Sequence, residues 1–155
     1  MSAITSSFIH PTVGFYALAL VLPFLRGKAW KWLLLIPPAI AIYSVMTITP
    51  GMYGELNYLG QKLLLGRVDK LSLIFAQVFA VMSFIGMVYA LHVEDKLQHI
   101  MACVYVGGAF GCTFAGDLLT LFIFWELMSI GSTFLIWLAR NPISTKAGYR
   151  YFLYH

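Results

Sequence analysis

The stretch LLTLFIFWELMSIGSTFLIWLA, residues 118–139, decides the fold class of this chain. It is a continuous apolar run whose one charged residue, Glu126, stands near its middle. A transmembrane helix needs about 20 apolar residues to cross a hydrocarbon core about 30 Å thick, so the run is long enough to span a bilayer. A carboxylate at the bilayer centre costs at least about 2.5–3.5 kcal/mol on insertion scales, and such residues usually mark ion or proton pathways. The sequence therefore predicts a membrane-spanning helix with Glu126 as the main functional candidate.

The composition extends this interpretation to the whole chain. With 61% hydrophobic and 10% charged residues and a mean hydropathy of +0.83, the 155 residues have too little polar surface for a soluble globule. The apolar runs do not alternate with period two, and lipid tolerates only helices or closed barrels, so strands are not expected to span. We expect an all-α integral membrane protein, a single transmembrane domain over residues 1–155, with five spans near residues 8–25, 30–48, 71–91, 98–115 and 118–139.

The distribution of basic residues predicts the orientation. The loops on one side carry Arg26, Lys28, Lys31, Lys96, Arg140, Lys146 and Arg150, and those on the other carry Lys62, Arg67 and Lys70. The positive-inside rule places the larger set in the cytoplasm, so the N-terminus and the connector 49–70 are expected outside. This asymmetry accounts for the net charge of +4 without nucleic-acid binding.

The connectors and small residues predict how the helices meet. Residues 53–68 contain glycines and β-formers, which leaves a hairpin or a re-entrant loop open. Pro37 and Pro38 predict a kink or local unwinding, and Asp117 is expected to cap the last span rather than to take part in transport. Small residues four apart favour close helix packing; the rows are Cys103, Gly107, Gly111, Ala115 and Gly108, Cys112, Gly116. The two cysteines have no metal-ligand spacing and are interpreted as buried free thiols.

Two hydroxyl residues accompany Glu126. At 100° per residue, Ser129 and Thr133 fall within about 60° of Glu126 on the helix, and a carboxyl with two hydroxyls on one stripe can hold water or a hydrogen-bond chain. We expect these three residues to take part in ion translocation. The alternative is a protonated glutamate that only joins two helices. The four histidines, His10, His92, His99 and His155, lie near the ends of apolar runs, where interfacial or loop positions explain them better than metal binding.

Three segments resemble a known family. They are DLLTLFIFWELMS at 117–129, GRVDKLSL at 66–73 and KAGYRYFL at 146–153. They are similar to the antiporter-like membrane subunits of Mrp-type cation/proton antiporters, of respiratory complex I and of membrane-bound hydrogenases, in an inner or cytoplasmic membrane. The resemblance implies that Glu126 matches the family's essential glutamate, which pairs with a lysine on the seventh helix. It also implies a hairpin on the outer side after the second helix.

The resemblance covers the N-terminal third of such a subunit. The paired lysine, a central lysine on the eighth helix and an exit residue on the twelfth would lie beyond His155, which stands near the start of the sixth helix. The chain is therefore expected to be the first piece of a split or truncated subunit, or a short paralogue, and to need a partner chain that supplies a Lys facing Glu126. We expect residues 148–155 to enter the membrane, with a partner covering that end.

Two functions remain open at this stage. The first is a component of a membrane arm that translocates H⁺ or Na⁺, as in a complex I-like oxidoreductase or a multisubunit antiporter. The second is a structural subunit that bridges larger subunits, with Glu126 as a polar anchor. No nucleophile–base pair, phosphate loop or cofactor motif occurs in the sequence, so we expect no cofactor in this chain.

Overall fold

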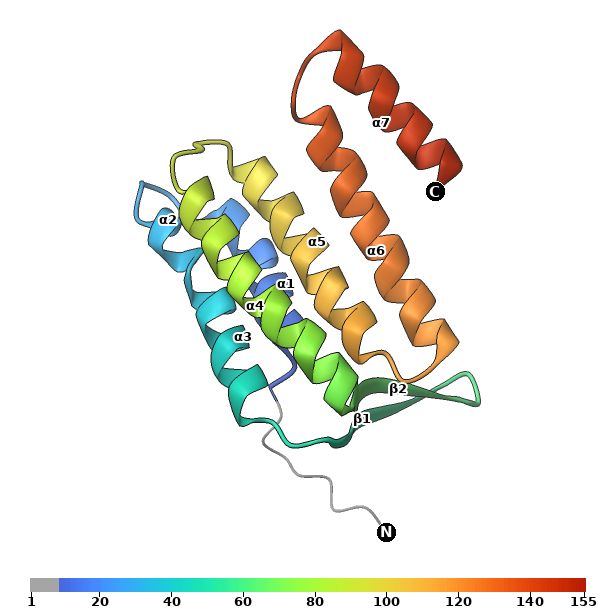
Figure 1. The fold of residues 1–155 in the computed structure, drawn as a ribbon. Helices are drawn as coiled ribbons and strands as arrows, with labels where there is room; N and C mark the ends of the chain where they lie inside the picture. Colours follow the sequence, from blue (N-terminus) through green and yellow to red (C-terminus); the bar gives the residue numbers. More distant parts are fainter. Residues whose placement is uncertain (1–8) are drawn as a thin grey trace.

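The computed structural model describes residues 9–155 and is a bundle of helices with one two-stranded hairpin (Figure 1). In chain order, the elements are α1 (Pro11–Val21), the 3₁₀ helix η1 (Leu22–Phe24), α2 (Trp30–Leu33), α3 (Ile36–Thr47), β1 (Gly51–Tyr58), β2 (Gln61–Val68), α4 (Lys70–Ala90), α5 (Lys96–Phe114), α6 (Leu118–Trp137) and α7 (Pro142–Tyr154). The prediction of a mostly helical membrane protein is confirmed.

The described residues contain four helical segments long and apolar enough to cross a membrane: Trp30–Thr47, Lys70–Ala90, Lys96–Phe114 and Leu118–Trp137. The first apolar segment, Pro11–Phe24, is shorter than these. The first helix was expected to begin at Phe8, which lies outside the described residues, and it starts at Pro11, with His10 as its N-cap. Five full-length spans are therefore not found in residues 9–155.

The second expected helix is interrupted just before its prolines, as the predicted local unwinding requires. The break falls at Leu34 and Leu35, between α2 and α3. Pro37 and Pro38 lie in the first turn of α3, where a missing backbone N–H leaves no helical hydrogen bond unmade. Pro37 and Pro38 cannot donate to the carbonyls of Leu33 and Leu34, so the helix is interrupted before them and starts again with them in its first turn.

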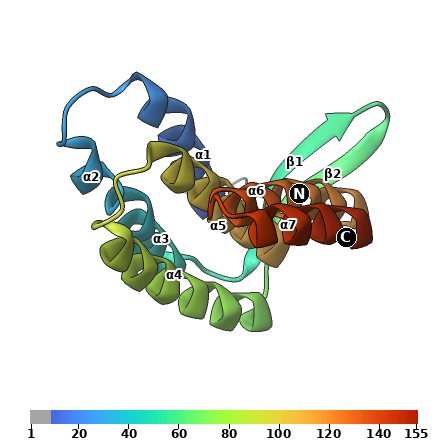
Figure 2. The same cartoon turned by 90° about the horizontal axis from the view of Figure 1, so that it is seen from above.

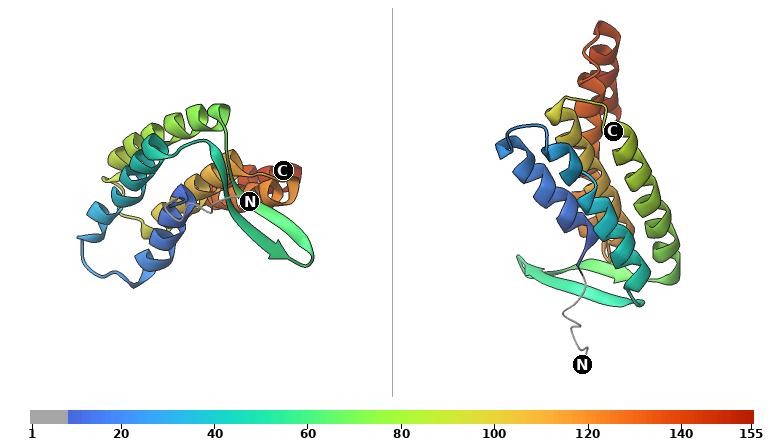
Figure 3. Two further views of the ribbon diagram at one scale, coloured as in Figure 1. Left: turned by 90° about the horizontal axis from the view of Figure 1, so that it is seen from below. Right: turned by 90° about the vertical axis from the view of Figure 1, so that its left-hand side faces the viewer.

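Residues 51–68 form an antiparallel hairpin, so the connector that the sequence left open folds as paired strands. Gly51 pairs with Val68 and Tyr58 with Gln61. The turn places Leu59 and Gly60 at φ 49° and 78°. Positive φ at both positions is the requirement of the type I′ turn, whose twist matches that of the strands. The hairpin lies at the end of the bundle where α4 begins and α5 passes into α6, and it reaches out to one side (Figure 3).

Helix α5 lies in the middle of the bundle and contacts α1, α4 and α6 (Figure 2). A Cβ at Gly107 would lie 2.9 Å from Cε1 of Tyr16 in α1, and one at Gly108 would lie 3.0 Å from Cβ of Met128 in α6. The small residues of α5 therefore permit close approach to two different helices. This is the packing role expected of them.

Helix α7 folds back against α6 instead of continuing away from it (Figure 1). It begins at a capping box, in which Asn141 Oδ1 accepts from the backbone N–H of Ser144 and Ser144 Oγ accepts from the backbone N–H of Asn141. A Cβ at Gly148 would lie 2.2 Å from the indole nitrogen of Trp137. The glycine thus lets the end of α6 and the first half of α7 pack closely.

Candidate functional site

Glu126 lies on the outward face of α6. Its side chain is exposed, and so are those of its neighbours Phe122, Ile123 and Ile130. Within residues 9–155 the structure shows no hydrogen bond or ion pair to the Glu126 carboxylate. Glu126, the residue of this run that is most costly to insert into a bilayer, therefore points away from the bundle. The surface around it is otherwise apolar.

Ser129 and Thr133 do not join Glu126 in one hydrogen-bonded group. Both are buried, and their hydroxyls donate within α6 itself: Ser129 Oγ to the carbonyl of Trp125 at 2.9 Å, and Thr133 Oγ1 to the carbonyl of Ser129 at 2.8 Å. Ser and Thr commonly bond back to the preceding turn of their own helix in this way. Ser129 and Thr133 lie on the side of α6 predicted from the sequence, but their hydroxyls donate to backbone carbonyls and not to Glu126.

The contact between α6 and α7 brings a residue to this region that the sequence interpretation placed elsewhere. Trp125 Nε1 donates to His155 Nε2 at 2.7 Å, and the His155 ring stacks on Tyr151 with centroids 5.0 Å apart. Two turns further along α6, Ser132 Oγ donates to the Tyr151 hydroxyl at 3.0 Å. His155 therefore does not lie in an interfacial loop but against the middle third of α6, beside the residue that precedes Glu126.

A sequence signal for this contact was available. Gly148, Tyr151 and His155 are spaced three and four apart, which places them on one face of a helix. The same face meets Trp137, Ser132 and Trp125 in turn along α6. Their spacing becomes informative only once α7 is known to run back along α6.

Asp117 links the hairpin to α6 as well as capping the helix. Its Oδ1 accepts from the backbone N–H of Thr120 at 2.8 Å, and its Oδ2 accepts from the backbone N–H of Leu64 in β2 at 2.7 Å. The Gly116 N–H donates to the Leu64 carbonyl at 2.9 Å. Burial opposes ionisation, but the bonds from Thr120 and Leu64 outweigh it and hold the pKa of Asp117 below its usual range. The expected capping role is confirmed.

Asp117→Ala is expected to lower the stability of the protein by about 0.5–2 kcal/mol, because an N-cap acceptor is lost and the Leu64 N–H loses its partner. Asp117→Asn should cost less, since Asn is an equally good cap. The thermal midpoint of the protein in lipid nanodiscs measures both. Because the folded-state pKa is depressed, the contribution of Asp117 is present at neutral pH and is lost as the pH falls through that value. An alanine variant as stable as the wild type would contradict this role.

The end of the bundle opposite the hairpin is held by charged residues. Arg140 pairs with Asp95 at 2.7 Å, Lys31 pairs with Glu94 at 3.7 Å, and the Lys96 ammonium donates to the Leu25 carbonyl. Through these bonds, the α4–α5 connector and the start of α5 are joined to α2, to the end of η1 and to the α6–α7 connector. The basic residues assigned to one side by charge counting thus gather at one end of the structure or along α7.

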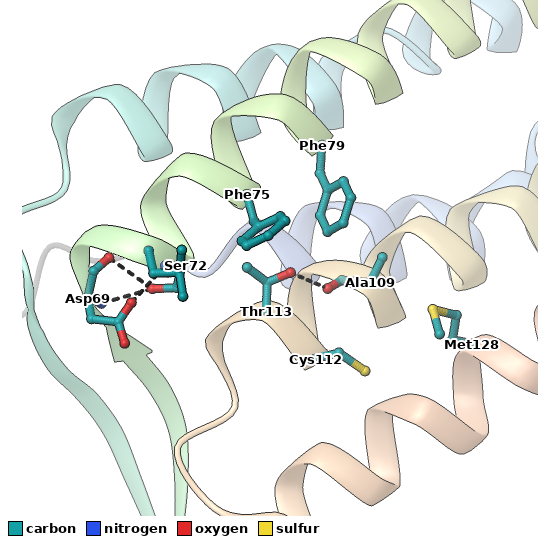
Figure 4. A pocket seen from close by; sticks show the side chains of 9 residues that line it. Asp69, Ser72, Phe75, Phe79, Ala109, Cys112, Thr113 and Met128 are labelled. Carbon is teal, nitrogen blue, oxygen red and sulfur yellow. Dashed lines mark hydrogen bonds between the residues drawn. The ribbon is translucent and has the colours of Figure 1, made fainter.

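A groove of about 450 Å³ opens between α4, α5 and α6 (Figure 4). Phe75 and Phe79 of α4 face α5 across it. Its polar groups are already bonded: Asp69 caps α4 through Ser72, and Thr113 Oγ1 donates to the Ala109 carbonyl at 2.8 Å. The groove is therefore an apolar surface without an unpaired reactive group among these lining residues.

No group of three or more His, Cys, Asp or Glu side chains that could hold a metal occurs within residues 9–155. Cys103 is buried and Cys112 half-buried, and both are free thiols.

The groups on or beside α6 are a carboxylate, a histidine and hydroxyls. Such groups can move protons or cations.

Residues 115–155 match the family model described as "NADH:quinone oxidoreductase/Mrp antiporter, TM". The resemblance to antiporter-like subunits is confirmed. The matched residues include Asp117, Glu126 and all of α7. No curated protein matches the chain.

The fold is also similar to a solved structure, that of the membrane-bound sulfane sulfur reductase, an archaeal respiratory membrane complex. The TM-score is 0.76 at 21% sequence identity, and the match covers 82% of this chain and 22% of the other. The chain thus spans about a fifth of the length of the subunit that it matches. The fold is thus similar to that of a multi-pass membrane subunit, and residues 115–155 resemble the respiratory and antiporter family.

Proposed function

We propose that this chain forms part of the membrane arm of a complex that translocates H⁺ or Na⁺, and that Glu126 is its intramembrane charge-pair residue. The observation that carries the proposal is the position of Glu126, exposed on an apolar face of α6 with no partner in residues 9–155. Intramembrane carboxyls are costly and generally serve ion or proton pathways. The substitution Glu126→Gln in the assembled complex, argued in the Discussion, tests the proposal.

The partner of Glu126 is proposed to be a lysine on another polypeptide or on further helices of the same subunit. In hydrocarbon alone, desolvation favours the neutral carboxyl, whereas an ammonium within about 4–6 Å favours the carboxylate. Movement of that lysine toward Glu126 would then favour the carboxylate, and movement away would favour the protonated carboxyl. Such a change couples proton uptake at Glu126 to motion or charge in the neighbour.

Ser129 and Thr133 belong to the same proposal in a lesser role. Each hydroxyl donates to a carbonyl of α6, but each oxygen retains lone pairs that can accept from water. They could therefore hold water on the side of α6 that leads from Glu126 toward the α7 contact.

The alternative function is a structural subunit in which Glu126 anchors α6 to a neighbouring helix. It is favoured by the finding that the hydroxyls of Ser129 and Thr133 bond within the helix and not to Glu126. The two functions differ in one measurable respect. An anchor is needed for assembly, whereas a translocation residue is needed for flux after assembly.

The proposed orientation places the hairpin outside and the basic end of the bundle in the cytoplasm. A cysteine introduced at Lys28 should be labelled by a membrane-impermeant thiol reagent only from the cytoplasmic side, and one at Lys62 only from the outside, because the two positions lie at opposite ends of the bundle. Inverted and right-side-out vesicles provide the two measurements. Labelling of position 28 from the outside would reverse the orientation.

A further inference from the structure

His155 brings a second ionisable side chain to the level of Glu126. Trp125 lies in the middle third of α6, and α6 is one of the four helices able to cross a membrane. A side chain bonded to the Trp125 indole at 2.7 Å therefore lies within the hydrocarbon core. Ionisable residues at that depth are rare and commonly belong to proton relays.

The hydrogen bond identifies the protonation state of the His155 ring. An indole N–H can only donate, so His155 Nε2 must be the acceptor. The ring is then neutral, with its proton on Nδ1. A proton taken up at Nε2 removes the acceptor and ends the bond to Trp125. The neutral ring is also packed on Tyr151, whose hydroxyl accepts from Ser132.

We propose that His155 is a proton-accepting residue of the ion path, which alternates between a neutral ring bonded to Trp125 and an imidazolium that serves as a counter-charge for the Glu126 carboxylate. Glu126 follows Trp125 in α6, about 3.8 Å away between Cα atoms and about 100° around the helix, so the ring must turn away from Trp125 to approach the Glu126 carboxylate. An imidazolium beside a carboxylate stabilises both charges. This inference rests on the proposed function of Glu126.

Few other ionisable groups face this site from the two helices packed here. On α6 the one titratable residue is Glu126. The titratable residues of α7 are Lys146, Tyr149, Arg150, Tyr151 and Tyr154. Of these, Tyr151 contacts the His155 ring in the structure.

His155→Gln in the full assembled complex tests the proposal. The Gln side-chain oxygen can still accept from Trp125, but the amide cannot take up a proton. Ion flux into proteoliposomes should fall on the order of 10²-fold, the usual contribution of a positioned proton-transfer group. Any part of the pH dependence of wild-type flux that comes from proton uptake at His155 should also disappear. Wild-type flux with a wild-type pH profile would overturn the proposal.

Trp125→Phe provides the opposite test, because it keeps the histidine and removes the donor. The neutral ring loses its hydrogen-bond donor, so both the ion flux and its dependence on pH should differ from those of the wild type. A purely structural contact would reduce stability and leave the pH profile where it is. His92→Gln is the matched control, since His92 lies exposed just beyond the end of α4 and bonds the Tyr89 carbonyl; its flux and profile should equal the wild type.

A readout independent of flux separates this inference from the proposed function. In the assembled complex labelled with ¹⁵N-histidine, the signal absent from the His155→Gln sample should show proton uptake at Nε2. Wild-type flux in Glu126→Gln would refute the proposed function, whereas the ¹⁵N-histidine signal of His155 decides the inference by itself. A His155 signal that stays neutral over the whole working pH range would refute the inference.

Discussion

Glu126→Gln is expected to abolish ion translocation by the assembled complex while leaving assembly intact. Gln has nearly the shape of Glu but cannot ionise, so it can neither carry a proton nor pair with a lysine. The Glu126 side chain is exposed and bonds nothing within residues 9–155, so the packing of the bundle should not change. Flux into proteoliposomes, measured with a pH-sensitive dye or with labelled Na⁺, gives the loss, which should exceed about 10²-fold.

Two matched variants sharpen this test. Glu126→Asp keeps the carboxylate on a shorter arm and should retain partial flux. Glu55→Gln removes a carboxylate from an exposed position of β1 and should behave as the wild type. If the complex carries out electron transfer, Glu126→Gln should slow or uncouple it. The proposal fails if a fully assembled Glu126→Gln complex translocates ions at the wild-type rate.

The partner can be identified from the same position. A photoreactive amino acid at position 126 should crosslink to a helix outside residues 9–155, because the outward face of α6 holds Leu119, Phe122 and Ile123 as further exposed side chains. A crosslinked peptide that contains an intramembrane lysine would support the charge pair. A crosslink to lipid alone would favour neither a lysine partner nor an anchor.

The long spans could be predicted from the sequence to within about two residues. Residues 71–91, 98–115 and 118–139 were expected, and the structure has Lys70–Ala90, Lys96–Phe114 and Leu118–Trp137. Each of these helices is a continuous apolar run that begins directly after an Asp N-cap, so its boundaries are well defined by the sequence. The caps are Asp69, Asp95 and Asp117. In the segment 30–48 the unwinding expected from Pro37 and Pro38 is found at Leu34 and Leu35, because the prolines remove hydrogen bonds to carbonyls one turn before them.

The candidate site could be predicted only in part, for a physical reason. Helical angles place Glu126, Ser129 and Thr133 on one side of α6, but they do not say which neighbour covers each turn. Inside a membrane a hydroxyl that bonds its own helix needs no other partner, so Ser129 and Thr133 are satisfied locally. His155 was missed because its role depends on α7 turning back along α6, a tertiary contact that no local pattern of α6 encodes.

The packing of α6 against α5 is expected to fail in Gly131→Leu. A Cβ at Gly131 would lie 3.0 Å from the Tyr105 nitrogen and 3.2 Å from the Met101 carbonyl oxygen. These are backbone atoms of α5, so they can move aside only if the whole helix shifts. Overpacking of this kind costs about 1–3 kcal/mol, occasionally more. A displaced α6 would also carry Glu126 out of register with its partner, so assembly and flux should fall together.

Gly86→Leu is the matched control for Gly131→Leu, because both glycines lie inside long apolar helices and a Cβ at Gly86 meets nothing within 4 Å. Replacing Gly by Leu improves helix propensity by up to about 1 kcal/mol at either site. The control should therefore be as stable as the wild type or slightly more so, and the difference between the two variants isolates the contact with α5. The thermal midpoint of the assembled complex in lipid nanodiscs measures that difference. Equal midpoints would mean that α6 does not depend on close approach to α5, and that Glu126 is positioned by its partner and not by this chain.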